Sequence, residues 1–315
     1  MLHLHEGGAA ADVSDSVPLM LPHLCRHCAD REEGVRTMVA ECLGLLTCLS
    51  PSIILPRLGL LVDEHGGKKY AEGTDEVDAL VCCTVAASVK FAIAGHAKPA
   101  DLSPFMPSFL VLLNEEALSA KNAALLMIYA AVHHTPQLVA GLMAEHILPS
   151  LHELATLNLK RTVDMGPFKH HVDDALPLRK AALGIFATCL EKCPGCLDMS
   201  AFVPILAKAL EDVEDVQLQA HQIVVSMCYR HPGPIVGAVE TFVEPLEKTV
   251  NKKKGQKTGT ELERVNEWIK SGLRVMVALG RVDGVMECRK FADFLDRTRK
   301  NSKFHPMLKM IDEER

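Results

Sequence analysis

Apolar residues recur along most of this chain at steps of three and four, which is the period of one face of an α-helix. Within residues 32–49, for example, Val35, Val39, Leu43 and Leu46 follow this step. Such stretches come in pairs that are separated by short polar turns. The pattern therefore predicts a series of helical hairpins, each of which buries an apolar face against its neighbours.

Two marks repeat with the helix pairs. A proline set among apolar residues is expected to open the first helix of each pair, and a basic or polar residue comes early in the second helix. A helix pair that recurs about every 40–47 residues is typical of HEAT and armadillo repeats. We therefore predict an all-α, HEAT/armadillo-like α-solenoid. The marks are Pro22, Pro56, Pro107, Pro149, Pro204 and Pro245 in the first helices, and Arg36, Lys121, Arg179 and Gln217 in the second helices.

Irregular spacing between these marks predicts two insertions. Pro107 and Lys121 are 14 residues apart, whereas Pro149 and Arg179 are 30 apart, which leaves 30 − 14 = 16 extra residues. We assign this excess to an inserted segment at 159–174, and a polar stretch at 65–75 to a second inserted loop. Insertions in repeat proteins form loops that often lie on a binding face.

The longer insertion has the pattern of a β-hairpin. Val163 and Met165 alternate with polar residues, as in a strand, and Gly166-Pro167 is a strong turn signal. Exposed apolar side chains on a protrusion suggest contact with a partner, although the segment could instead fold back on the convex face. The predicted partner-binding residues are Arg161, Thr162, Val163, Asp164, Met165, Gly166, Pro167, Phe168, Lys169, His170, His171, Val172, Asp173 and Asp174.

Length and composition fit one long helical array. We expect a flexible segment at 1–15, then a continuous HEAT-repeat array over 16–315 that ends in a polar C-terminal cap. Apolar residues make up 48% of the 315 residues and aromatic residues only 4%, which favours an Ala/Leu/Val/Met interior between closely packed helices.

Charge and cysteine usage narrow the possible partners and location. The net charge of −6 argues against a nucleic-acid partner, which usually meets a basic stripe. Eleven cysteines without a secretory signal indicate reduced thiols in the cytoplasm or nucleus. No run of about 18 uninterrupted apolar residues occurs, so we predict neither a membrane span nor a membrane partner.

Several candidate chemical sites have plainer explanations. Cys25 and Cys28 could form a local zinc site with nearby histidines, but their stretch also reads as an apolar helix end. Cys193 and Cys196 resemble a redox dithiol, yet they follow a helix C-terminus, where the helix dipole opposes a thiolate. The pair His133-His134 fits a helix end, whereas His170-His171 fits partner contact. We predict no metal, cofactor or enzymatic activity.

One stretch carries a specific resemblance. Residues 164–174, with the sequence Asp-Met-Gly-Pro-Phe-Lys-His-His-Val-Asp-Asp, are similar to the C-terminal region of the cullin-associated, neddylation-dissociated HEAT-repeat family, also described as TATA-binding-protein-interacting. Residues 39–44, 54–58, 88–91 and 243–246 resemble neighbouring repeats of that family. The resemblance extends from about Val17 to the C-terminus.

The resemblance implies a regulator of cullin–RING ubiquitin ligases. Its family members wrap unneddylated cullins, and their C-terminal repeats lie against the cullin N-terminal repeat, where substrate adaptors dock. The family's hairpin, which corresponds to residues 161–174 here, intrudes into that adaptor site and promotes exchange of substrate receptors. An alternative is a generic HEAT adaptor, such as a transport factor or a partner of the TATA-binding protein.

Two departures from the family pattern are expected. Family members are several times longer, and their N-terminal repeats, which contact the cullin C-terminal domain and the RING subunit, are absent here. The chain could therefore be a fragment, a partial gene model or a short form. In addition, the insertion at 66–75 is not part of the family pattern.

Overall fold

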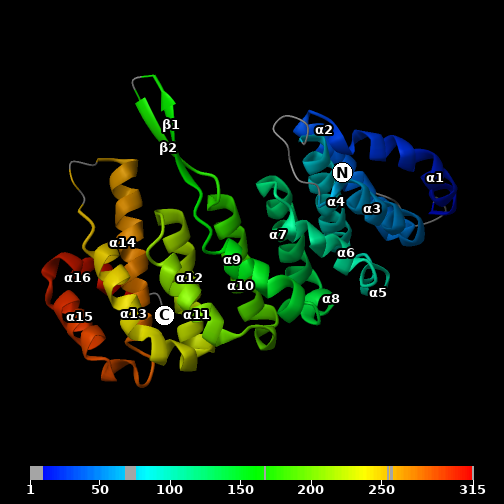
Figure 1. The fold of residues 1–315 in the computed structure, drawn as a ribbon. Helices are drawn as coiled ribbons and strands as arrows, with labels where there is room; N and C mark the ends of the chain where they lie inside the picture. Colours follow the sequence, from blue (N-terminus) through cyan, green and yellow to red (C-terminus); the bar gives the residue numbers. More distant parts are fainter. Residues whose placement is uncertain (1–9, 68–75, 167, 254, 256–257, 314–315) are drawn as a thin grey trace. The chain divides into compact units, whose positions relative to one another are not determined.

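The computed structural model describes residues 10–67, 76–166, 168–253, 255 and 258–313. The chain forms two compact units, Met1–Leu197 and Asp198–Arg315. Both are built from paired helices (Figure 1). This confirms the predicted all-α, HEAT/armadillo-like fold with one inserted hairpin, whereas a single continuous array stays a prediction. Most of the predicted 65–75 insertion lies outside the described residues, as does part of the basic stretch at 252–257.

The first unit contains four helix pairs. Two short helices, α5 and α8, precede the third and fourth pairs, and of these only α5 was not anticipated from the sequence. In chain order the elements are α1 Ala10–Arg26, η1 His27–Ala29, α2 Glu33–Leu49, α3 Pro51–His65, α4 Glu76–Ala94, α5 Pro99–Leu102, α6 Met106–Leu110, η2 Val111–Asn114, α7 Leu118–His134, α8 Gln137–Ala140, η3 Met143–Ile147, α9 Leu148–Leu154, β1 Lys160–Met165, β2 Phe168–Asp173, α10 Leu176–Lys192 and η4 Pro194–Cys196.

The second helices of these pairs form one packed layer. Helix α2 contacts α4, α4 contacts α7, and α7 contacts α10. The approach of α2 to α4 is so close that a Cβ atom on Gly44 would lie 2.5 Å from Cβ of Phe91. Only glycine fits there without moving the backbone of one helix.

Helix α4 is the central apolar element of this layer. In length and composition it is the one helix among the described residues that could cross a membrane. Ten of its residues are buried between α2, α3 and α7, among them Cys82, Val85 and Val89. Its apolar character is therefore explained by burial within the protein on both sides.

The second unit repeats the paired arrangement. Helix α12 packs against α14, and α13 packs against α11, α14 and α15. Residues 285–300 form a short 3₁₀ turn followed by a helix. The elements are α11 Met199–Ala209, α12 Glu214–Arg230, α13 Pro232–Val250, α14 Thr260–Leu279, η5 Val285–Glu287, α15 Arg289–Lys300, η6 Ser302–Phe304 and α16 His305–Glu313.

Four second helices share a common design. Helices α2, α7, α10 and α12 are each 17 residues long. In all four the predicted polar mark is the fourth residue, and a proline follows it 15 positions later. The residue before that proline leaves the helical conformation, with φ between −149° and −138°. Proline disfavours a helical residue before it and suits the first turn of the next helix, so it separates the two helices.

In three of these helices the polar mark contacts a backbone carbonyl ahead of its helix. Arg36 Nη1 donates to the carbonyl oxygen of Asp30 at 2.6 Å, and Gln217 Nε2 donates to that of Asp212 at 2.9 Å. Arg179 contacts the carbonyl oxygen of Leu157 in the same way. The recurring residue therefore satisfies backbone groups that the turn leaves without partners.

The prolines of the first helices do not all open their helices. Pro107 and Pro149 lie in a first turn, as predicted. The other four lie inside helices, where each removes one backbone hydrogen bond and favours a bend. The prediction was wrong for two of them because another proline begins the helix: Pro51 begins α3 and Pro232 begins α13. It was wrong for the other two because α1 and α11 begin several residues before the proline. The four are Pro22, Pro56, Pro204 and Pro245.

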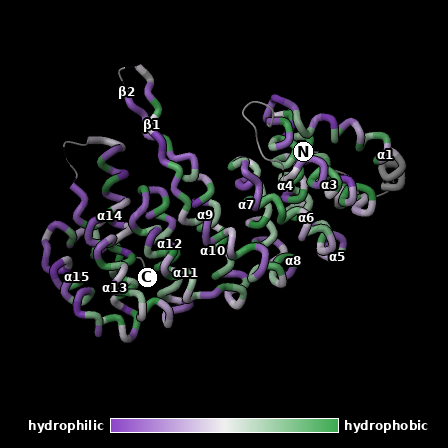
Figure 2. Tube along the Cα trace, viewed as in Figure 1, coloured by the Kyte–Doolittle hydropathy of each residue, from purple (hydrophilic) through white to green (hydrophobic). Residues whose placement is uncertain are grey.

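Apolar side chains gather where helices meet. Figure 2 shows hydrophobic stretches along helices of each unit, whereas the two strands of the hairpin are largely hydrophilic. Large side chains that are fully buried include Phe109 and Phe186 in the first unit and Phe202, Phe242 and Phe291 in the second. Buried phenylalanine side chains thus contribute to the core of each unit.

Candidate functional site

The predicted insertion forms an antiparallel hairpin between α9 and α10. Strand β1 pairs with β2 from Lys160 opposite Asp173 to Met165 opposite Phe168. Between the strands, Gly166 has φ of 68°, a left-handed conformation that glycine adopts without steric cost. The hairpin projects away from α9 and α10 rather than folding back on them (Figure 1).

A buried ion pair holds the base of the hairpin. Arg179, the fourth residue of α10, is 3% exposed. Its Nη2 donates to Oδ2 of Asp173 at 2.6 Å, and its Nη1 donates to Oδ1 at 3.1 Å and to the carbonyl oxygen of Leu157 at 2.9 Å. The hydrogen bonds from Arg179 hold the pKa of Asp173 below its usual value. One guanidinium therefore ties the chain on both sides of the hairpin to α10.

An exposed ion pair lies at the same end. Arg161 contacts Asp174 through both Nε and Nη2, with 3.3 Å between Nη2 and Oδ1. These hydrogen bonds lower the pKa of the Asp174 carboxyl. Farther along the strands, Thr162 Oγ1 and His171 Nδ1 are 3.1 Å apart and bridge β1 and β2. The hairpin thus carries its own cross-strand ties.

The structure places the predicted site residues in one protrusion. Pro167, together with the side chains of Met165 and Phe168, lies outside the described part of the chain. Val172 of β2 is half-buried. Arg179 was recognised as a mark of the repeat but not as part of the site. Its link to Asp173 joins the end of the hairpin to α10, and no local sequence pattern indicates it.

The cysteine motifs lack the features of metal or redox sites. All eleven cysteines are free thiols. Burial raises the pKa of Cys28 to about 12 and also raises that of Cys25. Cys193 follows the C-terminus of α10, as predicted, and burial is the main cause of its raised pKa. These shifts favour the protonated thiol, which is a poor nucleophile.

The histidine motifs likewise form no metal site. His133 stacks on Tyr129 with ring centroids 6.0 Å apart, at the end of α7. Its ring stands at 85° to that of His134. Across the described residues, no group of three or more His, Cys, Asp or Glu side chains is arranged to hold a metal ion.

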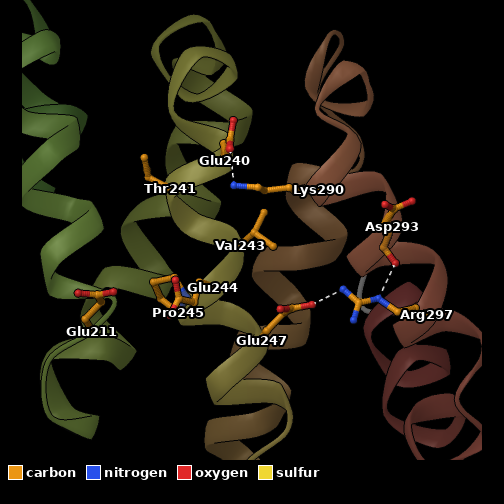
Figure 3. Close-up of a pocket in the computed structure, with 10 residues that line it drawn as sticks. All are labelled: Glu211, Glu240, Thr241, Val243, Glu244, Pro245, Glu247, Lys290, Asp293 and Arg297. Atoms are coloured by element: carbon orange, nitrogen blue, oxygen red, sulfur yellow. Dashed lines mark hydrogen bonds and ion pairs between the residues drawn. The ribbon is translucent and has the colours of Figure 1, made fainter.

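A charged groove lies between α13 and α15 in the second unit (Figure 3). It has a volume of about 390 Å³. Lys290 Nζ lies 2.5 Å from a carboxylate oxygen of Glu240, and Arg297 Nη2 lies 2.5 Å from one of Glu247. These pairs link the two helices, so the groove is explained as an ion-pair ladder on the surface of the second unit.

Comparison with protein families gives a match over half of the chain. The family model TIP120, described as TATA-binding protein interacting (TIP20), matches residues 138–299. Both strands of the hairpin and its anchor Arg179 lie within the matched segment.

Curated relatives match nearly the whole chain. Cullin-associated NEDD8-dissociated protein 1 of Arabidopsis thaliana is 34% identical over 284 residues, which are 88% of this chain and 22% of the relative. Cullin-associated NEDD8-dissociated protein 2 of Rattus norvegicus is 32% identical over 92% of this chain and 22% of the relative. The C-terminal part of the Emericella nidulans protein 1 is 24% identical over 75% of this chain. The chain spans about a fifth of the length of these relatives.

A solved structure supports the fold. A chain in the structure that describes Kap95p binding to RanGDP superposes with a TM-score of 0.67 at 13% identity, over 96% of this chain and 35% of that chain. At this low identity the likeness establishes a shared helical-repeat fold and nothing about partners.

Proposed function

The chain belongs to the TIP120 family of TATA-binding-protein-interacting proteins, and from this premise we propose that it binds the N-terminal repeat of a cullin. In this proposal the hairpin occupies the site where substrate adaptors dock. The chain then competes with adaptors and promotes exchange of substrate receptors on cullin–RING ubiquitin ligases. It acts by binding rather than catalysis, in the cytoplasm or the nucleus.

The observation that carries the proposal is the anchored, projecting hairpin. It interrupts an otherwise helical unit and lies within the family segment at 138–299. Its base is fixed to α10 by the buried Arg179–Asp173 pair. Relatives that share this segment are named for their association with cullins and for dissociation linked to NEDD8. An element that is held at its base and free along its length suits insertion into a groove on another protein.

Competition of this kind has a simple energetic form. If the hairpin and an adaptor require the same patch, each lowers the affinity of the cullin for the other by the same factor. A hairpin that leaves the site loses few contacts, whereas the helical surface can stay bound. Both ligands can therefore be held briefly on one cullin while one replaces the other.

The test removes the hairpin without removing its anchor. Lys160 and Asp173 face each other in register, so a Gly-Gly turn can join them in place of residues 161–172. This variant keeps Asp173 as the partner of Arg179 and preserves the buried ion pair. Its helical content and unfolding midpoint should match those of the wild type. Binding of an adaptor to the cullin N-terminal repeat is then measured in the presence of wild-type protein and in the presence of the shortened variant.

We expect wild-type protein to weaken adaptor binding and the shortened variant to have little effect. A folded variant that still competes as well as wild type would refute a role for the hairpin. Wild-type protein that fails to bind the cullin repeat at all would refute the proposed function itself.

The description of the family as TATA-binding protein interacting favours a second candidate function. A HEAT scaffold that binds the TATA-binding protein would need no adaptor site and no sensitivity to neddylation. Parallel binding assays with purified TATA-binding protein, unmodified cullin and neddylated cullin separate the two. Our proposal predicts the strongest binding to unmodified cullin, whereas the second candidate predicts binding to the TATA-binding protein alone.

A further inference from the structure

The register of the hairpin separates its residues into two unlike faces. Side chains of directly opposed residues in an antiparallel pair lie on the same face, and successive residues alternate between faces. One face therefore carries Lys160 with Asp173, Thr162 with His171, and Asp164 with Lys169. The other carries Arg161 with Val172, and Val163 with His170. We call these the Thr162 face and the Val163 face.

The Thr162 face is matched within the hairpin itself. Polar groups on this face have partners across the strands. Thr162 and His171 lie within hydrogen-bond distance at 3.1 Å, and the negative Asp164 lies opposite the positive Lys169. Burying such charged and polar groups against a partner would cost their hydration. This face is therefore suited to remain in water.

The Thr162 face is also the one turned toward the helical body at its base. Asp173 belongs to this face and extends to Arg179 of α10, whose side chain is only 4% exposed. At the base, Val172 on the Val163 face is half-buried, whereas Thr162 and His171 on the other face are exposed.

The Val163 face is apolar at its centre. Val163 and Val172 are both partly exposed, and His170 lies opposite Val163. Arg161, the charged residue at the edge of this face, is held by Asp174. Over the whole hairpin, three positive residues (Lys160, Arg161, Lys169) balance three negative ones, so 3 − 3 leaves no net charge. A neutral face with two valines matches an uncharged, apolar partner surface.

We propose that the hairpin docks through its Val163 face, with Val163, His170 and Val172 against an apolar groove of the cullin N-terminal repeat, while the Thr162 face stays solvated. This inference rests on the proposed function and adds the orientation of the hairpin and the chemistry of its groove. It also implies that the contribution of the hairpin to binding depends little on salt concentration, because no net charge is brought to the contact.

Two matched double variants test the orientation. The first is Val163→Asp with His170→Asp, and the second is Thr162→Asp with His171→Asp. Each adds two carboxylates at opposed positions of the same two strands, so their effects on hairpin charge are equal. Amide hydrogen exchange in the two strands and circular dichroism are used to check that both double variants remain folded. The single variants His170→Asp and His171→Asp repeat the comparison at positions that are already exposed.

Competition with an adaptor on the cullin N-terminal repeat is the readout. We expect the Val163-face variants to compete about tenfold or more weakly, because a carboxylate is poorly accommodated in an apolar groove. Thr162 and His171 were among the partner-binding residues predicted from the sequence, but in this proposal they stay solvated. The Thr162-face variants should therefore stay within about twofold of wild type.

The remaining outcomes overturn the proposal. Equal loss in both pairs, loss confined to the Thr162 face, or no loss in either pair would each show that the hairpin does not dock through Val163 and His170. In these three cases, comparing wild-type protein with the variant in which Gly-Gly replaces residues 161–172 still shows whether the hairpin is needed for competition with the adaptor. If wild-type protein itself fails to bind the cullin repeat, the proposed function fails and this inference fails with it.

Discussion

Arg179 illustrates how one side chain serves both the repeat and the site. As the fourth residue of its helix it occupies the place of Arg36 and Gln217, which close the turns before their own helices. The inserted hairpin adds Asp173 to its partners. A residue of the repeat has thereby become the anchor of a protrusion, and the pattern alone could predict the first role but not the second.

Replacing Arg179 should therefore damage the unit more than replacing the exposed Arg161. In Arg179→Met, the carboxylate of Asp173 stays in a site with little water and loses its guanidinium, which costs about 3–5 kcal/mol. In Arg161→Met, an exposed pair is lost, at a cost of about 1 kcal/mol or less. Urea unfolding followed by circular dichroism measures both free energies. Equal destabilisation by the two substitutions would contradict the anchoring role.

A buried histidine is expected to make the second unit sensitive to acid. His221 of α12 is 2% exposed, lies within hydrogen-bond distance of Ser271 through Nδ1, and has no hydrogen-bond partner for its Nε2. Burial lowers its pKa to about 4. The unfolded chain, with a pKa of about 6.5 at this residue, then binds the proton more readily than the folded chain.

The stability of the second unit should consequently fall as the pH decreases from about 6.5 to about 4, by up to roughly 3 kcal/mol from this residue. Trp268 is the single tryptophan of the chain and lies in α14, so its fluorescence reports unfolding of this unit. The variant His221→Gln should lose most of this pH dependence. An unchanged slope in the variant would show that another group is responsible.

At the scale of elements, helices and hairpin differ in how well the sequence predicts them. The four 17-residue helices are marked by a polar residue and a proline 15 positions later. This signal survives insertions because the polar residue lies in the first turn of the helix and the proline lies just beyond its end. The first helices carry no such fixed pair. Their recurring proline lies in the first turn of two helices and inside four others that packing stabilises, so it does not reliably mark the start.

The hairpin was predictable because its turn has a local cause. Gly166 supplies the left-handed backbone and the strands alternate around it. The sequence does not predict which residues share a face of the hairpin, because a shift of one residue in the strand register moves each side chain to the opposite face. The anchor was missed for a different reason, since it joins the hairpin to another element and leaves no local pattern.

Gly166→Ala should loosen the hairpin while leaving the helices intact. A Cβ atom at φ of 68° costs roughly 1–2 kcal/mol, which a two-stranded element cannot readily offset. Amide exchange in β1 and β2 should become faster, and the unfolding midpoint of the helices should stay constant. Gly34→Ala is the control, because its Cβ meets open space in a helix. Unchanged exchange in the strands of Gly166→Ala would contradict this account of the turn.

At the scale of the whole molecule, fold and family follow from different kinds of signal. Helical period and composition are sufficient for the all-α class, because burying an apolar stripe requires neighbouring helices. The partner is not encoded in those features. It is inferred from one specific stretch, residues 164–174, and from relatives of which this chain spans 22%. The proposal thus depends on whether this part of the family sequence is sufficient for binding.

The most direct measurement is a binding cycle with the chain, an adaptor and the cullin N-terminal repeat. The dissociation constant of each ligand is determined in the absence and in the presence of the other. Our account predicts that the adaptor weakens binding of the chain by the same factor by which the chain weakens binding of the adaptor, and that the factor approaches one when residues 161–172 are replaced by Gly-Gly. Affinities that are independent of each other, with both ligands bound together at full strength, would contradict it.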